Sequence, residues 1–142
     1  MSTTDPIRDL NQLQQLADYF LSRKKYRDYT MIVLGVYTVL RISDLLSLQW
    51  SHVCDPSGRF YTHITVLEQK TDKKKIIALN DKAIEALHLL YPHRRSAYIF
   101  ASRNGKGDSI TRIHSWRLIN IAVKELGLDG VISCHSLRKT LE

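Results

Sequence analysis

The chain has 142 residues, enough for one domain with a buried core. Its composition is that of an ordinary globular protein: 44% hydrophobic and 25% charged residues, with six Gly and three Pro. These totals exclude a disordered, fibrous or repeat protein, and no apolar run approaches the roughly 20 residues of a membrane-spanning helix. Lys and Arg outnumber Asp and Glu by 21 to 14, which gives a net charge of +7. Such an excess is typical of proteins that bind a polyanion such as DNA or RNA.

The first residues give no sign of export. Residues 1–8 lack both the charged start and the apolar stretch of a secretory signal, so we expect an N-terminal tail on a soluble, cytoplasmic protein. The two cysteines, Cys54 and Cys134, are then expected to be reduced thiols. Each has a histidine close by (His52 and His135), so a shared zinc site is an alternative, although neither pair has the usual ligand spacing.

Three helices are predicted in the first 50 residues. Asp9 is in a capping position, and apolar residues follow at helical spacing over residues 10–21. A second apolar face extends over residues 29–40, and this helix is expected to run directly into Arg41. A third, short helix is predicted over residues 43–50.

The middle of the chain changes to a strand pattern. Residues 60–67 are rich in aromatic and β-branched side chains, and residues 74–79 form a second strand-like run. The polar residues 68–73 lie between them and end in a tight turn. This pattern predicts a β-hairpin with a basic tip.

The remaining segments are again helical. Asn80 or Asp81 caps a helix that ends at Pro92, and residues 98–100 form a short buried segment. A longer helix begins at Ser109 or Thr111 and is closed by a glycine, Gly127, while residues 133–140 start a last helix. The apolar face of the longer helix is predicted to consist of Ile113, Trp116, Ile119, Val123 and Leu126. Helices, a small antiparallel hairpin and further helices indicate a predominantly helical α+β fold.

Four side chains suggest chemistry. Arg41 follows an apolar helix face, where a charge needs a partner or a ligand, and Lys70 is near the hairpin tip. His135 and Arg138 are three residues apart and would share one face of a helix. Together these donors and cations would suit a phosphodiester, because Arg binds phosphate with two hydrogen bonds and Lys or His can move a proton. Taken singly, an Arg is more often a surface or ion-paired residue, a hairpin Lys is more often solvated, and a His-x-x-Arg spacing occurs often by chance.

Three segments together resemble the tyrosine recombinases, the phage integrase family. Residues 37–50, which contain Leu-Arg-Ile-Ser-Asp and end in Leu-Gln-Trp, resemble the first signature of the family. Residues 68–73 (Glu-Gln-Lys-Thr-Asp-Lys) resemble its hairpin with a Lys-Thr-Gly-Lys type of turn. Residues 135–140 (His-Ser-Leu-Arg-Lys-Thr) resemble its second signature. The matches come in family order, with 29 residues from Arg41 to Lys70 and 65 from Lys70 to His135.

The resemblance implies a partial tyrosine recombinase catalytic domain over residues 9–142 and a role for each candidate. Arg41 and Arg138 would clamp the scissile phosphate, Lys70 would protonate the leaving 5′ oxygen, and His135 would assist proton transfer at the nucleophile. Asp44 occupies the position of the usual Glu and would support the site. The family requires no metal and no cofactor.

The chain departs from the family pattern in two ways. Val39 replaces the common Gly before Leu-Arg, which is expected to stiffen the turn into Arg41. The family also places its nucleophilic tyrosine well downstream of the second signature. Seven tyrosines are present, and all precede His135: Tyr19, Tyr26, Tyr29, Tyr37, Tyr61, Tyr91 and Tyr98. Several fit apolar faces, so we expect a fragment that ends before the nucleophile.

The predicted function is therefore that of a fragment of a site-specific DNA recombinase, which cuts and rejoins DNA through a phosphotyrosyl intermediate. The fragment is expected to bind double-stranded DNA, and the parent protein to assemble as a homo-oligomer on it. One alternative is a non-catalytic DNA-binding module on the same fold. A second is a helical protein-interaction domain whose basic charge is incidental.

Overall fold

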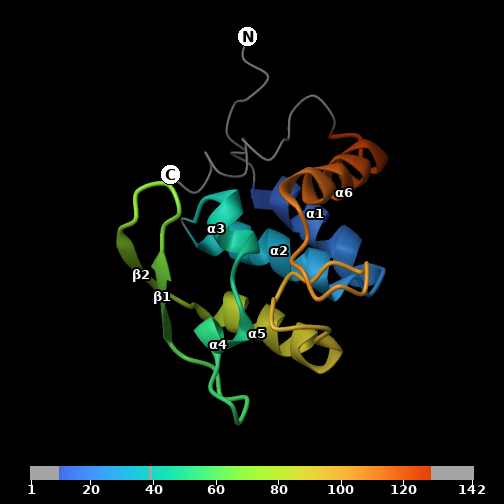
Figure 1. The fold of residues 1–142 in the computed structure, drawn as a ribbon. Coiled ribbons are helices and arrows are strands. Elements are labelled where there is room, and N and C mark those ends of the chain that lie inside the picture. The colour runs from blue at the N-terminus through green and yellow to red at the C-terminus, as the bar shows by residue number, and fades with distance from the viewer. Residues whose placement is uncertain (1–9, 39, 129–142) are drawn as a thin grey trace.

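The structure, a computed structural model, describes residues 10–38 and 40–128 and has the predicted α+β architecture (Figure 1). The N-terminal tail, Val39 and residues 129–142 lie outside the described residues, and with them Asp9, Cys134, His135, Arg138 and the predicted last helix. The described elements are α1 (Leu10–Ser22), α2 (Tyr26–Tyr37), α3 (Ile42–Leu46), α4 (Trp50–Val53), β1 (His63–Leu67), β2 (Lys74–Ala78), α5 (Asp81–Leu90), the 3₁₀ helix η1 (Tyr91–His93) and α6 (Arg112–Glu125).

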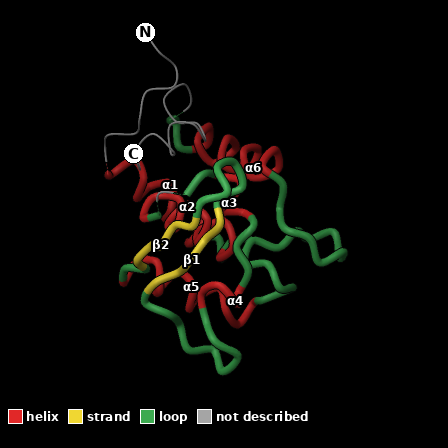
Figure 2. Tube along the Cα trace, turned by 60° about the vertical axis from the view of Figure 1, so that its left-hand side comes forward, coloured by secondary structure: helices red, strands yellow, loops and turns green. Residues whose placement is uncertain are grey.

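Helix α2 is the centre of the helical layer and packs against both α1 and α5. Leu34 of α2 and Leu87 of α5 are fully buried, because both helices turn an apolar face toward the same core. Thr30 is also buried, and its hydroxyl donates to the carbonyl of Ala86 at 3.1 Å, which ties α2 to α5. The hairpin lies at one side of this layer and α6 at the other (Figures 1 and 2).

The predicted continuation of the second helix into Arg41 is wrong. Helix α2 ends at Tyr37, and Thr38 is extended, with φ −116° and ψ 147°. Both the backbone N–H and the hydroxyl of Thr38 donate to the carbonyl of Leu34, at 2.9 and 2.6 Å. These two bonds close the last turn, so the chain changes direction before Arg41.

The predicted third helix over residues 43–50 is interrupted. Helix α3 ends at Leu46, because the backbone of the next residues pairs with another segment of the chain. Trp50 N–H donates to the carbonyl of Ala97 at 2.9 Å, and Ile99 N–H donates to Leu48 at 3.1 Å. These contacts confirm the buried segment predicted over residues 98–100, of which Ile99 and Phe100 are buried. Helix α4 then starts separately at Trp50.

The hairpin is confirmed as two antiparallel strands, with His63 opposite Ala78 and Leu67 opposite Lys74. The first strand begins at His63 rather than at Phe60, which instead forms an isolated bridge with Cys54. Alternation along β1 turns Ile64 and Val66 toward the core, and Leu67 toward solvent. The hairpin therefore has one face packed against the core and one face open to solvent. Its polar loop lies at the side of the helical layer.

For α5 and α6, the structure shows which of the two candidate residues caps the helix. The Asn80 side chain accepts from Ala83 N–H at 2.9 Å and caps α5, and the Thr111 hydroxyl accepts from His114 N–H at 3.1 Å and caps α6. After α6, Gly127 has φ +73°, the left-handed conformation expected of a residue that closes a helix.

The predicted buried face of α6 is only partly correct. Ile119 and Val123 are buried, but Ile113 is 62% exposed and Trp116 is 44% exposed. The buried positions next to Ile119 and Val123 are instead the small residues Ser115 and Ala122. Helix α6 contacts both α1 and α3, and the face that it buries differs from the one that side-chain size alone suggests. Among residues 10–38 and 40–128, no helix is long and apolar enough to cross a membrane.

Candidate active site

Arg41 lies at the junction of α2 and α3, where its extended backbone (φ −66°, ψ 153°) forms the N-cap of α3. Its side chain is partly exposed, and Nε lies 4.0 Å from Oε2 of Glu68, at the end of the hairpin strand β1. This distance makes the contact a long ion pair rather than a tight hydrogen bond. The guanidinium is thus held between α3 and the hairpin while its N–H donors remain available to a ligand.

The hairpin loop is a closed turn. Glu68 N–H donates to the carbonyl of Lys73 at 2.9 Å, and Asp72 N–H donates to the carbonyl of Glu68 at 2.8 Å. Asp72 has φ +58°, a left-handed conformation that Gly adopts most easily and Asp tolerates. This residue stands where the resembling family turn has Gly, so the backbone geometry explains why either residue type fits.

Asp44 fastens this loop to α3. Its carboxylate is buried, and Oδ1 accepts a hydrogen bond from Gln69 N–H at 3.0 Å. The Gln69 side-chain amide also reaches the carbonyl of Ser43, at 3.5 Å. Within the described part of the chain, Oδ2 of Asp44 has no hydrogen-bond partner. Asp44 therefore positions the loop and keeps one buried acceptor oxygen unused.

Lys70 is carried at the Arg41 side of the molecule. It directly follows the anchored Gln69, two residues after the ion-pair partner of Arg41, and its side chain is exposed. No described residue forms an ion pair with it. Both views show the loop between β1 and β2 beside α3 (Figures 1 and 2). The structure thus brings the Lys70 loop next to Arg41, while the placement of His135 and Arg138 stays a prediction.

Glu68 and Gln69 position the hairpin loop against Arg41 and α3, a role that the sequence alone does not reveal. Both belong to the hairpin motif, which predicts no contact for either of them. A sequence signal existed for Glu68: a carboxylate at the end of an apolar strand, close to a lysine, is a candidate partner for a buried or half-buried cation.

Cys54 and His52, two residues of the alternative zinc site, make other contacts. Cys54 is buried, and its thiol donates to the carbonyl of Trp50 at 3.3 Å. His52 accepts from the backbone N–H of Gln49 through Nδ1 at 2.9 Å, which places that nitrogen in a helix-capping contact. Over residues 10–38 and 40–128, no group of three His, Cys, Asp or Glu side chains is arranged to hold a metal ion.

The tyrosines divide into two sets. Tyr37 and Tyr61 are exposed, and the other five are half-buried. Four of these five pack against the hydrophobic core, in agreement with the sequence analysis: Tyr19, Tyr26, Tyr29 and Tyr91. The phenol of Tyr19 donates to Oε2 of Glu125 at 2.7 Å, a hydrogen bond that raises the pKa of Tyr19, and burial raises the pKa of Tyr29. Both shifts favour the neutral phenol over the phenolate.

Comparison with known sequences agrees with this geometry. The sequence model of the phage integrase family matches residues 8–142. The chain is 34% identical over 141 residues to a probable integrase/recombinase, YoeC, of Bacillus subtilis (strain 168). The alignment covers 99% of this chain and 74% of that protein. It is 28% identical over 123 residues to the tyrosine recombinase XerD of Listeria monocytogenes serotype 4b (strain F2365), covering 79% of this chain and 38% of that protein.

Solved structures share the fold. The XerA recombinase superposes with a TM-score of 0.76 at 20% identity, over 96% of this chain and 48% of that one. The catalytic core of lambda integrase superposes with a TM-score of 0.74 at 19% identity, over 96% of this chain and 80% of that one. The fold is thus that of a tyrosine recombinase catalytic core. With the sequence match over residues 8–142, the chain belongs to the phage integrase family, the tyrosine recombinases. It spans about three quarters of the YoeC length but only 38% of the XerD length.

Proposed function

We propose that residues 9–142 form an incomplete catalytic domain that binds double-stranded DNA across the face carrying Arg41 and Lys70. The parent protein would cut one strand by tyrosyl attack, rejoin it, and assemble as a homo-oligomer on its site. The observation that carries this proposal is the Asp44–Gln69 hydrogen bond of 3.0 Å, because it fixes the lysine loop beside Arg41. Among proteins of the same fold, XerH was solved bound to its difH substrate and lambda integrase as a tetramer on a Holliday junction.

The proposed role of Arg41 follows from its surroundings. A guanidinium that is only partly exposed and loosely paired with Glu68 can turn two parallel N–H donors to a phosphate without losing a strong internal bond. Arg138 would supply the second such group. Fixed cations stabilise the extra negative charge of a pentacoordinate phosphorus, because they need no reorganisation as the charge develops.

The proposed role of Lys70 is that of a general acid. In the reaction, a tyrosine oxygen bonds to phosphorus while the bond from phosphorus to the 5′ oxygen breaks. Lys70 would give a proton to that leaving oxygen, and His135 would assist proton transfer at the attacking phenol. A lysine next to an anchored residue suits this task, since the backbone is held while the long side chain can reach.

The nucleophile is proposed to lie outside these 142 residues. Tyr19 and Tyr29 pack against the core and have raised pKa values, which disfavours the phenolate. Tyr37 and Tyr61 are exposed, but neither belongs to a segment downstream of the second signature, where the family places the tyrosine.

Fluorescence anisotropy with a labelled DNA duplex tests the binding face. The wild-type chain is expected to bind with a Kd of roughly 10⁻⁴ to 10⁻⁶ M, with affinity falling steeply as salt rises. The double variant Arg41→Gln/Lys70→Gln is expected to bind more weakly and with a shallower salt dependence. The matched control Arg59→Gln/Lys124→Gln removes the same charge from exposed positions elsewhere. Equal losses in the two double variants, or affinity independent of salt, would overturn the proposal.

A further inference from the structure

A second cationic site lies at the opposite end of α2 from Arg41. Here the start of α2 faces η1 and the segment around Ala101, and between them is a cavity of about 600 Å³. This volume is in the range of small-ligand sites. Helix α2 has 12 residues, so about 18 Å of helix separates the cavity from the Arg41 junction at a rise of 1.5 Å per residue. Six basic side chains line this Arg27 cavity: Lys24, Arg27, His93, Arg94, Arg95 and Arg103.

Arg27 is the fixed member of the set. It is only 9% exposed, and its Nε donates to Oδ1 of Asp28 at 3.0 Å while Nη1 donates to the carbonyl of Ala101 at 2.9 Å. These contacts use two of the five N–H donors of a guanidinium. The group is thus held rigid before any ligand arrives, and donors remain for one. A planar, pre-positioned guanidinium is suited to the oxygens of a phosphate.

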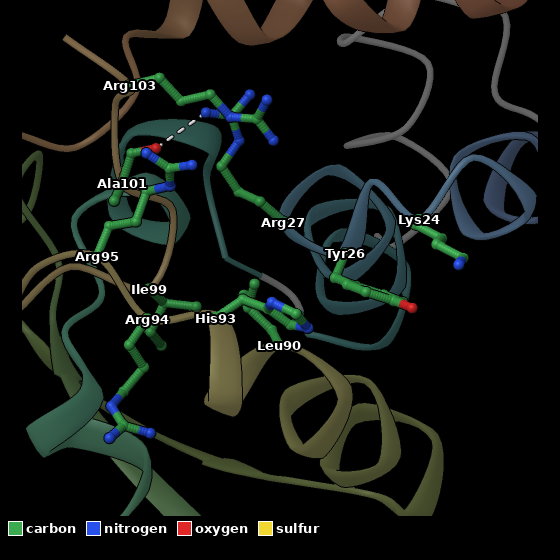
Figure 3. Close-up of a pocket in the computed structure, with 10 residues that line it drawn as sticks. All are labelled: Lys24, Tyr26, Arg27, Leu90, His93, Arg94, Arg95, Ile99, Ala101 and Arg103. Atoms are coloured by element: carbon green, nitrogen blue, oxygen red, sulfur yellow. Dashed lines mark hydrogen bonds between the residues drawn. The ribbon is translucent and has the colours of Figure 1, made fainter.

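Two exposed arginines extend toward Arg27. In Figure 3, the side chains of Arg95 and Arg103 point to the region of the Arg27 guanidinium from the facing segments. Arg94 points away, since its guanidinium lies 3.6 Å from the centre of the Tyr91 ring and donates to the Tyr91 carbonyl. The converging set is therefore Arg27, Arg95 and Arg103.

The charge of this set is poorly compensated inside the protein. None of the residues that line the cavity is acidic. Asp28 is paired with Arg27, and within the described part of the chain no carboxylate forms an ion pair with Arg95 or Arg103. Like charges that share a site repel one another, and an anion bound between them removes that repulsion.

We propose that the Arg27 cavity is a phosphate-binding site, separate from the Arg41 face, in which Arg27, Arg95 and Arg103 together hold one phosphate group of a larger anion. The phosphate has two potential sources, a free polyphosphate or the backbone of DNA that passes beyond the Arg41 face. Both offer the same chemistry to the three guanidinium groups, so the experiment is arranged to distinguish them.

Calorimetric titration with inorganic triphosphate at constant ionic strength tests the site itself. The wild-type chain is expected to bind it saturably, and Arg95→Gln/Arg103→Gln is expected to lower the affinity at least about tenfold. Arg59→Gln/Arg117→Gln, which removes the same charge from exposed positions outside the cavity, is expected to leave the affinity within about twofold. Lack of binding by the wild type, or equal losses in the two variants, would overturn the proposal.

DNA titrations with the same variants identify the source of the phosphate. If it belongs to DNA, the cavity variant is expected to reduce the slope of log K against log salt by about 0.9 relative to the control, and triphosphate competes with the duplex. If it belongs to a free polyphosphate, the two slopes are equal. Arg95 and Arg103 are exposed, so both variants are expected to melt like the wild type, and the single variant Arg103→Gln provides a second measurement. This result is independent of the Arg41 and Lys70 test, since either site can fail alone.

Discussion

The buried carboxylate of Asp44 accepts a hydrogen bond from the backbone N–H of Gln69, at 3.0 Å. This contact joins residues 25 positions apart and sets the hairpin loop against α3. A carboxylate that is one methylene shorter than the usual Glu still reaches the loop. The same residue thus connects the arginine junction to the lysine loop, and a change there is expected to affect both stability and DNA binding.

Asp44→Ala is expected to lower the free energy of unfolding by about 1–3 kcal/mol, because the Gln69 N–H loses its buried partner. Urea denaturation followed by circular dichroism measures the difference. Asp108→Ala is the matched control: its side chain is exposed, and we expect a change within about 0.5 kcal/mol. Asp44→Asn keeps an acceptor oxygen and is expected to fall between the two. Equal stability of Asp44→Ala and the control would show that the contact does not hold the loop.

The Asp55 carboxyl is predicted to contribute stability that depends on pH. Its pKa is lowered, first by the hydroxyl of Ser57, which donates at 2.6 Å, and then by the backbone N–H of Arg59, which donates at 3.0 Å. A lowered pKa in the folded state means that the contribution is fully present above the unfolded pKa of about 3.9 and is lost as pH falls through the folded value. The stability difference between wild type and Asp55→Ala should therefore shrink in acid below about pH 4.

Carbon-detected NMR titration of the Asp55 carboxyl gives the direct check, with Ser57→Ala as the variant that removes the hydroxyl donor. The pKa of Asp55 is expected to lie below the ordinary aspartate value of about 3.9. A midpoint at or above that ordinary value, or one that Ser57→Ala does not raise, would contradict the hydrogen-bonded turn.

Cys54 is expected to react slowly with thiol reagents in the folded protein. Burial raises the pKa of its thiol, and its hydrogen donates to the Trp50 carbonyl, so little thiolate is exposed. Labelling with iodoacetamide in a Cys134→Ser background should be slow at neutral pH and should accelerate in denaturing urea. Rapid labelling in the folded state would mean that the thiol is accessible.

A protein of these 142 residues is expected to form no covalent adduct with DNA. Incubation with nicked suicide substrates that carry candidate sites, followed by denaturing electrophoresis, detects a phosphotyrosyl bond. A band that survives detergent and disappears after protease treatment would assign the nucleophile to one of the seven tyrosines, and single Tyr→Phe variants would then identify it.

The sequence predicted the elements that simple local patterns define, and the structure differs where a single side-chain hydrogen bond or the packing of helices decides. The Asn80 cap, the hairpin and Gly127 follow from residue types at fixed spacing. The end of α2 depends on a Thr38 hydroxyl that turns back to Leu34, which apolar periodicity does not reveal. In α6, the alternative faces have similar spacing, and the helix, which contacts α1 and α3, buries the face with the small residues.

The candidate sites show the same division. Motifs identified Arg41 and Lys70 because short segments carry them, and the Asp44–Gln69 contact then brought those segments together. The Arg27 cavity had no such motif. Arg27, Arg95 and Arg103 are far apart in the sequence, and the fold brings them to one cavity.

NMR shift mapping shows directly whether DNA binds across the Arg41 and Lys70 face. On titration of the ¹⁵N-labelled chain with a DNA duplex, we predict that the largest changes occur at Arg41 Nε–H and at the backbone amides of Gln69, Lys70 and Thr71. The shift changes at Arg41 and those at the loop amides should both become smaller in Asp44→Ala, in which the loop loses its hydrogen bond to α3. Changes confined to other surfaces, with the Arg41 and Lys70 signals unmoved at saturation, would mean that DNA does not bind across this face.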